Sequence, residues 1–200
     1  MTRNIIAIDL DSCIGCHSCA VVCKQENNVG LGTYYNKVLT VGPFGTYPDL
    51  EMYYLPVACQ HCDNPSCLNV CPTGATQKRE DGIVWVDNEL CIGCESCIKA
   101  CPYEGVRTLI ANEPEYYLDV VVGEFDAPTH KAGTVEKCTF CHNLIDRGEV
   151  PACMQLCPAR ARYWGDLDDP ESDMSKYLAT REAVVLQEED GTGPKVSYIR

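Results

Sequence analysis

The sequence contains no run of eighteen apolar residues, so we do not expect the chain to span a membrane by itself. It also contains no phosphate-binding glycine loop, no nucleotide fingerprint and no Ser/His/Asp set in a recognisable context. Basic residues are few, with 16 Lys and Arg against 29 Asp and Glu, which argues against nucleic acid as a partner. Residues 1–5 lead directly into a short apolar segment, without the features of a secretory signal.

Cysteine, in contrast, is abundant, with 16 among 200 residues. Such a count indicates a disulfide-rich secreted scaffold, a multi-zinc protein or an electron carrier with several clusters. Disulfide scaffolds are normally short and enter a secretory route, so the absence of a signal argues against that class.

The most informative stretch is residues 91–102, which has the spacing C-x2-C-x2-C-x3-C-P. Bacterial ferredoxins use this spacing to hold [4Fe-4S] clusters. Three thiolates converge from one tight loop around Gly93, and the fourth, about one helical turn further on, reaches a second cluster. Zinc sites usually use two C-x2-C pairs far apart, so this spacing indicates iron and sulfur.

Three more cysteine groups are variants of the same motif. Residues 13–23 repeat it, with Lys24 standing where the later copy has Pro102. Residues 59–72 have a lengthened version, C-x2-C-x4-C-x3-C-P, and residues 138–158 have C-x2-C, eleven residues and then C-x3-C-P. Repeats in this order indicate one supersecondary unit used twice.

The ligand sets follow from the rule for two-cluster ferredoxins, in which the fourth cysteine of each motif binds the cluster of the other motif. For the second and third groups the rule predicts one cluster on Cys59, Cys62, Cys67 and Cys101, and another on Cys71, Cys91, Cys94 and Cys97. The outer groups then pair with each other, giving clusters on Cys13, Cys16, Cys19 and Cys157 and on Cys23, Cys138, Cys141 and Cys153. Ligation by cysteine throughout predicts four [4Fe-4S] clusters.

The predicted fold class is α+β, with two bacterial-ferredoxin-like two-cluster units, one nested inside the other, and loop and short-strand excursions. Residues 1–30 and 135–165 form the outer unit and residues 56–110 the inner one. Residues 31–55 and 111–134 are excursions that face a partner, and residues 166–200 form a C-terminal helix and strand. Local patterns predict strands at residues 4–9, 83–87, 116–122 and 195–199, and helices at 20–27 and 166–179.

Two further expectations concern packing. The aromatic-rich residues 31–55 form either a hairpin packed over the cluster core or a surface for a partner subunit. Because metal–thiolate binding supplies folding free energy, the chain without iron is expected to be unfolded or molten.

Other polar and aromatic residues near the motifs have simpler interpretations. The thiolate count is complete without the four histidines, so each is expected to lie behind the ligands or on the surface: His17, His61, His130 and His142. Seven basic residues flank the motifs, namely Lys24, Lys78, Arg79, Lys99, Lys137, Arg160 and Arg162. They could raise cluster potentials by offsetting negative charge, but each is interpreted most simply as a solvated side chain or a partner-facing ion pair. Trp85 and Trp164 are expected to pack against the clusters.

The order of the four cysteine groups, with the segments CPY at 101–103, VRTL at 106–109, EKCT at 136–139 and GDLDDPES at 165–172, resembles a known family. It is that of the four-cluster iron–sulfur (beta) subunits of the molybdopterin oxidoreductases, the dimethyl sulfoxide reductase family, and the resemblance covers nearly the whole chain. It implies an electron-transfer subunit of anaerobic respiration with no active site of its own. Its partner would be a catalytic subunit carrying molybdenum or tungsten on bis(pyranopterin guanine dinucleotide).

The resemblance also implies an orientation. The cluster that includes Cys157 would lie nearest the catalytic subunit, and the one that includes Cys71 farthest away, toward a membrane anchor subunit or a soluble donor. Cys94 stands where nitrate reductase relatives have tryptophan, which is why a cubane is expected there. The chain stops at Arg200 without the membrane helix of formate dehydrogenase relatives. It is therefore expected to be cytoplasmic, or carried across the membrane with a partner that has a twin-arginine signal, and peripheral to the membrane at most.

Two other functions stay open at this point. A free-standing soluble polyferredoxin would serve several reductases, although the long segments without cysteine look like surfaces for stable partners. A structural iron–sulfur subunit of a non-redox molybdopterin enzyme would hold clusters that do not turn over. The sequence does not name a substrate, because substrate chemistry would reside in the partner.

Overall fold

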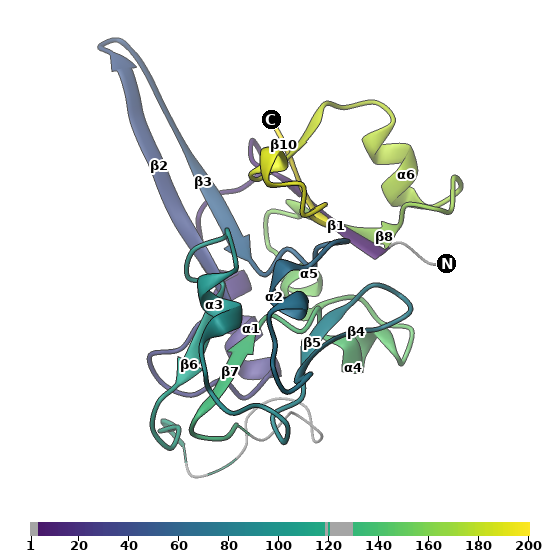
Figure 1. Cartoon of the computed structure of the whole chain (residues 1–200). Helices are drawn as coiled ribbons and strands as arrows, with labels where there is room; N and C mark the ends of the chain where they lie inside the picture. The colour runs from purple at the N-terminus through teal and green to yellow at the C-terminus, as the bar shows by residue number, and fades with distance from the viewer. Residues whose placement is uncertain (1–3, 119, 121–129) are drawn as a thin grey trace.

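The computed structural model describes residues 4–118, 120 and 130–200. Its largest sheet has four strands in the order β8-β1-β10-β9, and it joins the two ends of the chain (Figure 1). Strand β1 (Asn4–Asp9) pairs in parallel with β10 (Val196–Ile199) and antiparallel with β8 (Arg162–Asp166). Strand β9 (Ala183–Val185) completes the other edge. The near-continuous apolar run of β1 is what a central strand with two covered faces requires.

Each face of this sheet has its own apolar cluster. Ile6, Ile8 and Tyr198 pack on one side against Phe140 of the last cysteine group. The other side includes Ile5, Ala7 and Ile199, and it is covered by Met174 of helix α6 (Asp173–Leu178). The sheet therefore has a conventional apolar core on both faces.

A long hairpin projects from the body of the molecule (Figure 1). It consists of β2 (Asn36–Thr46) and β3 (Asp49–Ala58), with an irregularity in register between Val41 and Phe44. Its base is half-buried, but most residues of its outer half are exposed. The expectation of a hairpin is confirmed. The interpretation that it packs over the cluster core is wrong for the outer half, because that half stands away from the core.

The rest of the chain consists of short elements around the cysteines. Two small sheets pair β4 (Thr76–Lys78) with β5 (Val84–Val86) and β6 (Arg107–Ile110) with β7 (Thr134–Lys137). The helices are α1 (Ser18–Glu26), α2 (Ser66–Asn69), α3 (Ser96–Lys99), α4 (His142–Ile145) and α5 (Ala152–Gln155), and Glu188–Asp190 form a 3-10 turn. The fold is thus of mixed α and β type with few helical residues.

Most of the local predictions are confirmed, with three corrections. The strands at 4–9, 83–87 and 195–199 and the helix at 20–27 agree with β1, β5, β10 and α1 to within two residues. The C-terminal helix begins later than predicted, at Asp173, because Ser172 caps it by accepting a hydrogen bond from the Ser175 N–H. Residues 116–118 are not in a strand, and 119 and 121–122 lie outside the described residues. The β6–β7 pair was not predicted.

Candidate iron–sulfur sites

All four cysteine groups use the same backbone device, a left-handed residue just before the second cysteine. Gly15 and Gly93 have φ of 65° and 64°, which glycine adopts without steric cost. His61 and Phe140 occupy the equivalent positions with φ of 43° and 54°. Their rings stack on each other with centroids 3.7 Å apart, and both residues are buried. The stacking in the core compensates for a conformation that these residues seldom adopt.

Cysteines far apart in the sequence line shared cavities. One cavity is lined by Cys23, Cys138, Cys141 and Cys153. A second is lined by Cys71, Cys91, Cys94 and Cys97, and a third by Cys13, Cys16, Cys19 and Cys157. The remaining four are also neighbours, since Cys59 and Cys67 each act electrostatically on Cys62 and on Cys101. Within the described part of the chain, no three His, Cys, Asp or Glu side chains are placed to hold a single metal ion.

Backbone N–H groups point at several of the sulfurs. Donors 3.3–3.4 Å from sulfur are those of Thr76 to Cys71, Val135 to Cys91, Phe140 to Cys138 and Ala161 to Cys157. Such bonds favour the thiolate over the thiol and stabilise negative charge on sulfur. For Cys71, the N–H donors outweigh the effect of burial and lower the pKa to about 7.

The environment of the interior cysteines, in contrast, disfavours the thiolate form. Burial, with the neighbouring Cys153, raises the pKa of Cys141 to about 12. Burial also raises the pKa of Cys101 to about 11, and Cys59 adds to that rise. Clustered buried thiolates of this kind need positive charge among them, which iron supplies.

A buried guanidinium gives an independent test of that fit. Arg107 is 4% exposed and donates from Nη2 to Cys67 Sγ at 2.8 Å. Its Nε and Nη1 groups have no hydrogen-bond partner among the described residues. Unpaired buried N–H groups of a cation are costly unless an anion lies beside them. A [4Fe-4S] cluster with four thiolates is such an anion, so the residues present fit the group.

Two of the basic residues interpreted as solvated are in fact buried. Lys137 is 3% exposed and donates to the backbone carbonyls of Val84 and Cys138, and Arg162 is 6% exposed. That interpretation was wrong for both, because each side chain is drawn in by sulfur or by carbonyl oxygens. Lys99 and Arg160 are exposed, as expected.

Arg107 was missed by the sequence reasoning. It begins β6, six residues after Cys101, just as Arg162 begins β8 five residues after Cys157. A basic residue at the start of a short strand, a few residues after a Cys-Pro pair, is the signal that could have identified both.

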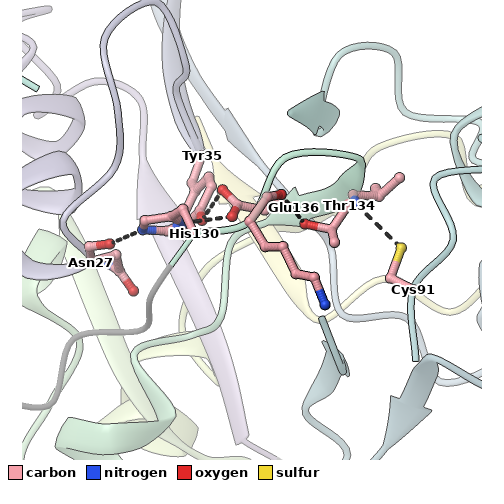
Figure 2. Close-up of polar contacts among 8 residues, drawn as sticks. Asn27, Tyr35, Cys91, His130, Thr134 and Glu136 are labelled. Atoms are coloured by element: carbon pink, nitrogen blue, oxygen red, sulfur yellow. Dashed lines mark hydrogen bonds and ion pairs between the residues drawn. The ribbon is translucent and has the colours of Figure 1, made fainter. Parts of the chain in front are cut away.

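Two of the histidines are part of the interior. His61 is fully buried, and its Nδ1 accepts a hydrogen bond from the Val84 N–H at 3.2 Å. Burial holds the pKa of His61 well below its ordinary value, so the ring is neutral. His130 is a link in the polar network of Figure 2, in which it contacts the Asn27 carbonyl at 2.7 Å and Glu136 at 2.5 Å. The expectation that the histidines lie behind the ligands agrees with these two positions.

Of the two tryptophans, Trp164 packs edge-on against Phe140, with ring centroids 5.4 Å apart. Trp85 is partly buried and lines a separate surface cavity with Arg79. The packing of Trp85 against a cluster stays a prediction.

Exposure separates two of the cysteines from the other fourteen. Cys16 and Cys94 are exposed, and every other cysteine is buried or partly buried. The two occupy equivalent places in the first and third groups, and each sulfur lies 3.4–3.5 Å from a serine hydroxyl, that of Ser18 or Ser96. The adjacent Ile14 and Ile92 are also exposed, at 62% and 65%. Two cavities therefore reach the surface through an apolar mouth.

Comparison with known proteins gives two matches to 4Fe-4S dicluster domains, one over residues 50–113 and 125–167 and one over residues 12–75. A protein of Halobacterium salinarum assigned as the iron–sulfur subunit of a dimethyl sulfoxide reductase is 46% identical, over 100% of this chain and 79% of its own length. The arsenate respiratory reductase iron–sulfur subunit of a Shewanella strain is 37% identical, over 98% of this chain and 95% of its own. A selenate reductase subunit of Mesobacillus selenatarsenatis is 39% identical, over 98% of this chain and 71% of its own.

These matches extend over the whole chain and contain all four cysteine groups. Two dicluster domains and sixteen cysteines give four [4Fe-4S] clusters. No helix in the described residues is long and apolar enough to cross a membrane. The chain belongs to the iron–sulfur electron-transfer subunits of the molybdopterin oxidoreductase family, and relaying electrons through its four clusters is its function.

Proposed function

We propose that the chain binds its clusters through the four cysteine quartets predicted from the motif spacing, and that Cys16 and Cys94 mark the two ends of the relay. The proposal rests on the observation that, of the sixteen cysteines, these two are the exposed ones. They belong to different quartets, and the other two quartets have no exposed member. Electron exchange with partners needs a cluster near the surface, whereas the interior sites only need to be near one another.

The quartets occur in a definite order. Cys153 of the second quartet acts electrostatically on Cys19 of the first, and Cys59 of the third acts on Cys138 of the second. Cys97 of the last quartet acts on Cys67 of the third. When bound, each cluster would supply reversible one-electron storage. The chain's own residues hold the sites in sequence, exclude water from the middle two and leave the outer two accessible.

The quartets also support a nested arrangement of two ferredoxin-like units. Two quartets combine cysteines from residues 13–23 with cysteines from 138–157, and β1 pairs with β8, so the outer unit joins both parts of the chain. The other two quartets lie wholly within residues 59–101. We assign residues 1–30 with 135–165 to the outer unit, 56–110 to the inner unit and 166–200 to the C-terminal helix and strand.

The partner is proposed to be a catalytic subunit carrying molybdenum or tungsten on bis(pyranopterin guanine dinucleotide). The relatives named above are subunits of reductases, which supports a stable complex. The Cys16 end would face this subunit and the Cys94 end a membrane anchor subunit or soluble donor. Transport of the folded complex with a twin-arginine-signalled partner, or retention in the cytoplasm, are the two locations consistent with the family.

The projecting hairpin is proposed to bind the same catalytic subunit, as the partner-facing part of residues 31–55. Its base packs on the first cysteine loop, since a Cβ added at Gly15 would lie 2.5 Å from the Tyr54 ring. Its outer half exposes large apolar side chains, namely Phe44, Tyr47, Leu50 and Met52. A surface of this composition beside the exposed Cys16 end is suited to a permanent interface. The second excursion, residues 111–134, includes ten residues outside those described.

The first experiment is metal analysis of the native complex, isolated without oxygen. About sixteen iron atoms per copy of the chain are expected, beyond those of the partner, with about one molybdenum or tungsten atom. Zinc in place of iron would overturn the ligand proposal, and iron without molybdenum or tungsten would contradict the proposed partner.

Serine substitution then tests the two ends. Cys16→Ser is expected to impair electron exchange with the catalytic subunit while a dye still reduces the clusters at the other end. Cys94→Ser is expected to impair exchange with the donor instead. The same defect in both variants would contradict the assignment of opposite ends.

A further inference from the structure

Three buried cations lie between successive cysteine quartets. The first is Arg162, which lines both the cavity that contains Cys19 and the cavity that contains Cys153. Its Nη1 lies 3.5 Å from Cys153 Sγ, and its Nη2 donates to Asn36 at 3.2 Å. Burial raises the pKa of Cys19, and the adjacent Arg162 opposes that rise. One guanidinium thus acts on the first and second quartets together.

Arg107 has the same relation to the third and fourth quartets. Its Nη2 donates to Cys67 at 2.8 Å, and Cys67 packs with Cys97 of the fourth quartet in one buried cluster. The charge of Arg107 also acts on Cys97. The two unpaired N–H groups described above therefore belong to a cation positioned between two sites.

Lys137 lies at the remaining junction. Its ammonium group donates to the carbonyl of Cys138, a member of the second quartet, at 2.8 Å. It also donates to the carbonyl of Val84, which packs in one buried cluster with Cys67 of the third quartet, and its charge acts on that cysteine. The stacked rings of His61 and Phe140 connect the cysteine loops of these same two quartets. Lys137 is therefore the cation between the outer and the inner pair of sites.

We propose that Arg162, Lys137 and Arg107 are positioning residues for the relay, each of which raises the reduction potentials of the two clusters that flank it. The inference rests on the ligand sets of the proposed function. Every junction between successive quartets has one of these cations, and each is at least nine-tenths buried.

The physical reason is electrostatic. Reduction adds one negative charge to a cluster that four thiolates already make anionic. A cation held nearby, where the dielectric is low and water does not screen it, stabilises the reduced state more than the oxidised state. The interaction falls with distance, so the two flanking clusters are affected more than the two remote ones. A cation between two anionic sites also offsets their mutual repulsion.

The chain offers matched controls for each type of cation. Arg160 is exposed and stands two residues from Arg162, and Lys99 is exposed and stands two residues from both Cys97 and Cys101. Substituting either removes the same charge at a similar sequence distance from a ligand, but from a position where solvent screens it.

The test is a potentiometric titration, followed by electron paramagnetic resonance, of the anaerobic complex with Arg162→Gln, Lys137→Gln or Arg107→Gln. Each variant is expected to shift two of the four reduction steps to lower potential. Of the two reduction steps that Lys137→Gln shifts, one should also be shifted by Arg162→Gln and the other by Arg107→Gln. Arg162→Gln and Arg107→Gln should have no shifted step in common. This overlap orders the steps without prior assignment of any signal.

Further variants keep the result decisive. Arg107→Lys retains the charge and is expected to retain potentials close to those of the wild type. Arg160→Gln and Lys99→Gln are expected to leave all four steps unchanged. If one variant fails to assemble, the other two still test the prediction, since each should shift two steps, with one step in common if Lys137→Gln is among them and none otherwise.

Each outcome has one meaning. Suppose that the wild-type complex contains about sixteen iron atoms per copy of the chain. The inference is then overturned by equal shifts of all four steps, by no shift, or by shifts that are as large in the exposed controls. A wild-type complex with fewer clusters would instead refute the proposed ligand sets.

Discussion

The terminal sheet and the region around Val84 are stabilised in different ways. In the sheet, Ile8, Tyr198 and Met174 are nearly inaccessible to water and pack against other apolar side chains. The buried cluster that contains Val84 consists of Val84, Val135, Cys67 and Cys97. Half of that cluster is thus cysteine, and the adjacent strands β4 and β5 have only three residues each.

The difference shows where each region obtains its folding free energy. The sheet gains it by removing apolar surface from water, at roughly 25 cal/mol per Å². The region around Val84 has little such surface to bury and depends on iron–thiolate bonds, whose binding free energy is folding free energy. Iron should therefore matter most where the apolar packing is thinnest.

Removal of iron should have the largest effect of all. The chain without clusters is expected to lose cooperative melting, because clustered thiolates are left uncompensated in the interior. Hydrogen exchange sharpens the comparison: amides of β4 and β5 should lose all protection, and those of β1 and β10 should keep the most. A folded chain without iron that melts in one cooperative transition would contradict the prediction.

The parts of this organisation that are encoded locally could be predicted from the sequence. The spacing of cysteines specifies tight loops, and Gly15 and Gly93 supply the left-handed residue that each loop needs. His61 and Phe140 give no such signal, because the conformation of each depends on a stacking partner in a distant segment of the chain. Long-range packing of this kind leaves no pattern in either segment alone.

The burial of the cations shows the same limit. Lys137 and Arg162 stand beside motifs in a strongly acidic chain, where a solvated side chain is the ordinary outcome for a basic residue. Their burial depends on which cysteines come together in space, and only the pairing of distant segments determines that. The run of apolar residues in β1 similarly indicates a central strand without identifying β8 and β10 as its neighbours.

A substitution in the polar network of Figure 2 can test whether the part of the chain around the cysteines depends on charges as well as on iron. The side chains of His130 and Glu136 are 1% and 4% exposed, and Tyr35 donates to the same carboxylate at 2.7 Å. Burial disfavours a charged ring, but the hydrogen bond to Glu136 outweighs it and raises the pKa of His130 above its ordinary value. His130→Ala should therefore destabilise the holoprotein by roughly 3–5 kcal/mol, by leaving a buried carboxylate without its cation.

The sign of the pH dependence follows from the raised pKa of His130. The charged ring contributes its full stabilisation below the unfolded-state pKa of about 6.5, and that contribution declines as pH rises through the folded-state pKa. The difference in thermal stability between wild type and His130→Ala should thus be larger at pH 6 than at pH 9. His142→Ala is the control, and an equal difference at both pH values would show that the pair acts only by packing.

A substitution in the sheet should reverse the regional pattern. Met174 is 1% exposed and covers Ile5, Ala7 and Ile199. Met174→Ala should cost roughly 2–5 kcal/mol, because it leaves a cavity in an apolar core. Hydrogen exchange of the holoprotein should show the loss of protection in β1 and α6 and an unchanged iron content. Release of iron by this variant would mean that the two regions are energetically one.

The smallest effect is expected at the start of α6, where the sheet region can be perturbed without changing its core. The Ser172 hydroxyl accepts the Ser175 N–H at 3.1 Å and donates to the Asp166 carbonyl at 2.8 Å. Ser172→Ala removes the cap and should cost about 1 kcal/mol, against a few tenths for Ser172→Gly. Hydrogen exchange should show faster opening of α6 alone, with β4, β5 and the iron content unaffected. Because Met174 lies two residues after the cap, a loss of protection that spreads into β1 would show that α6 and the sheet unfold as one unit, independently of the clusters.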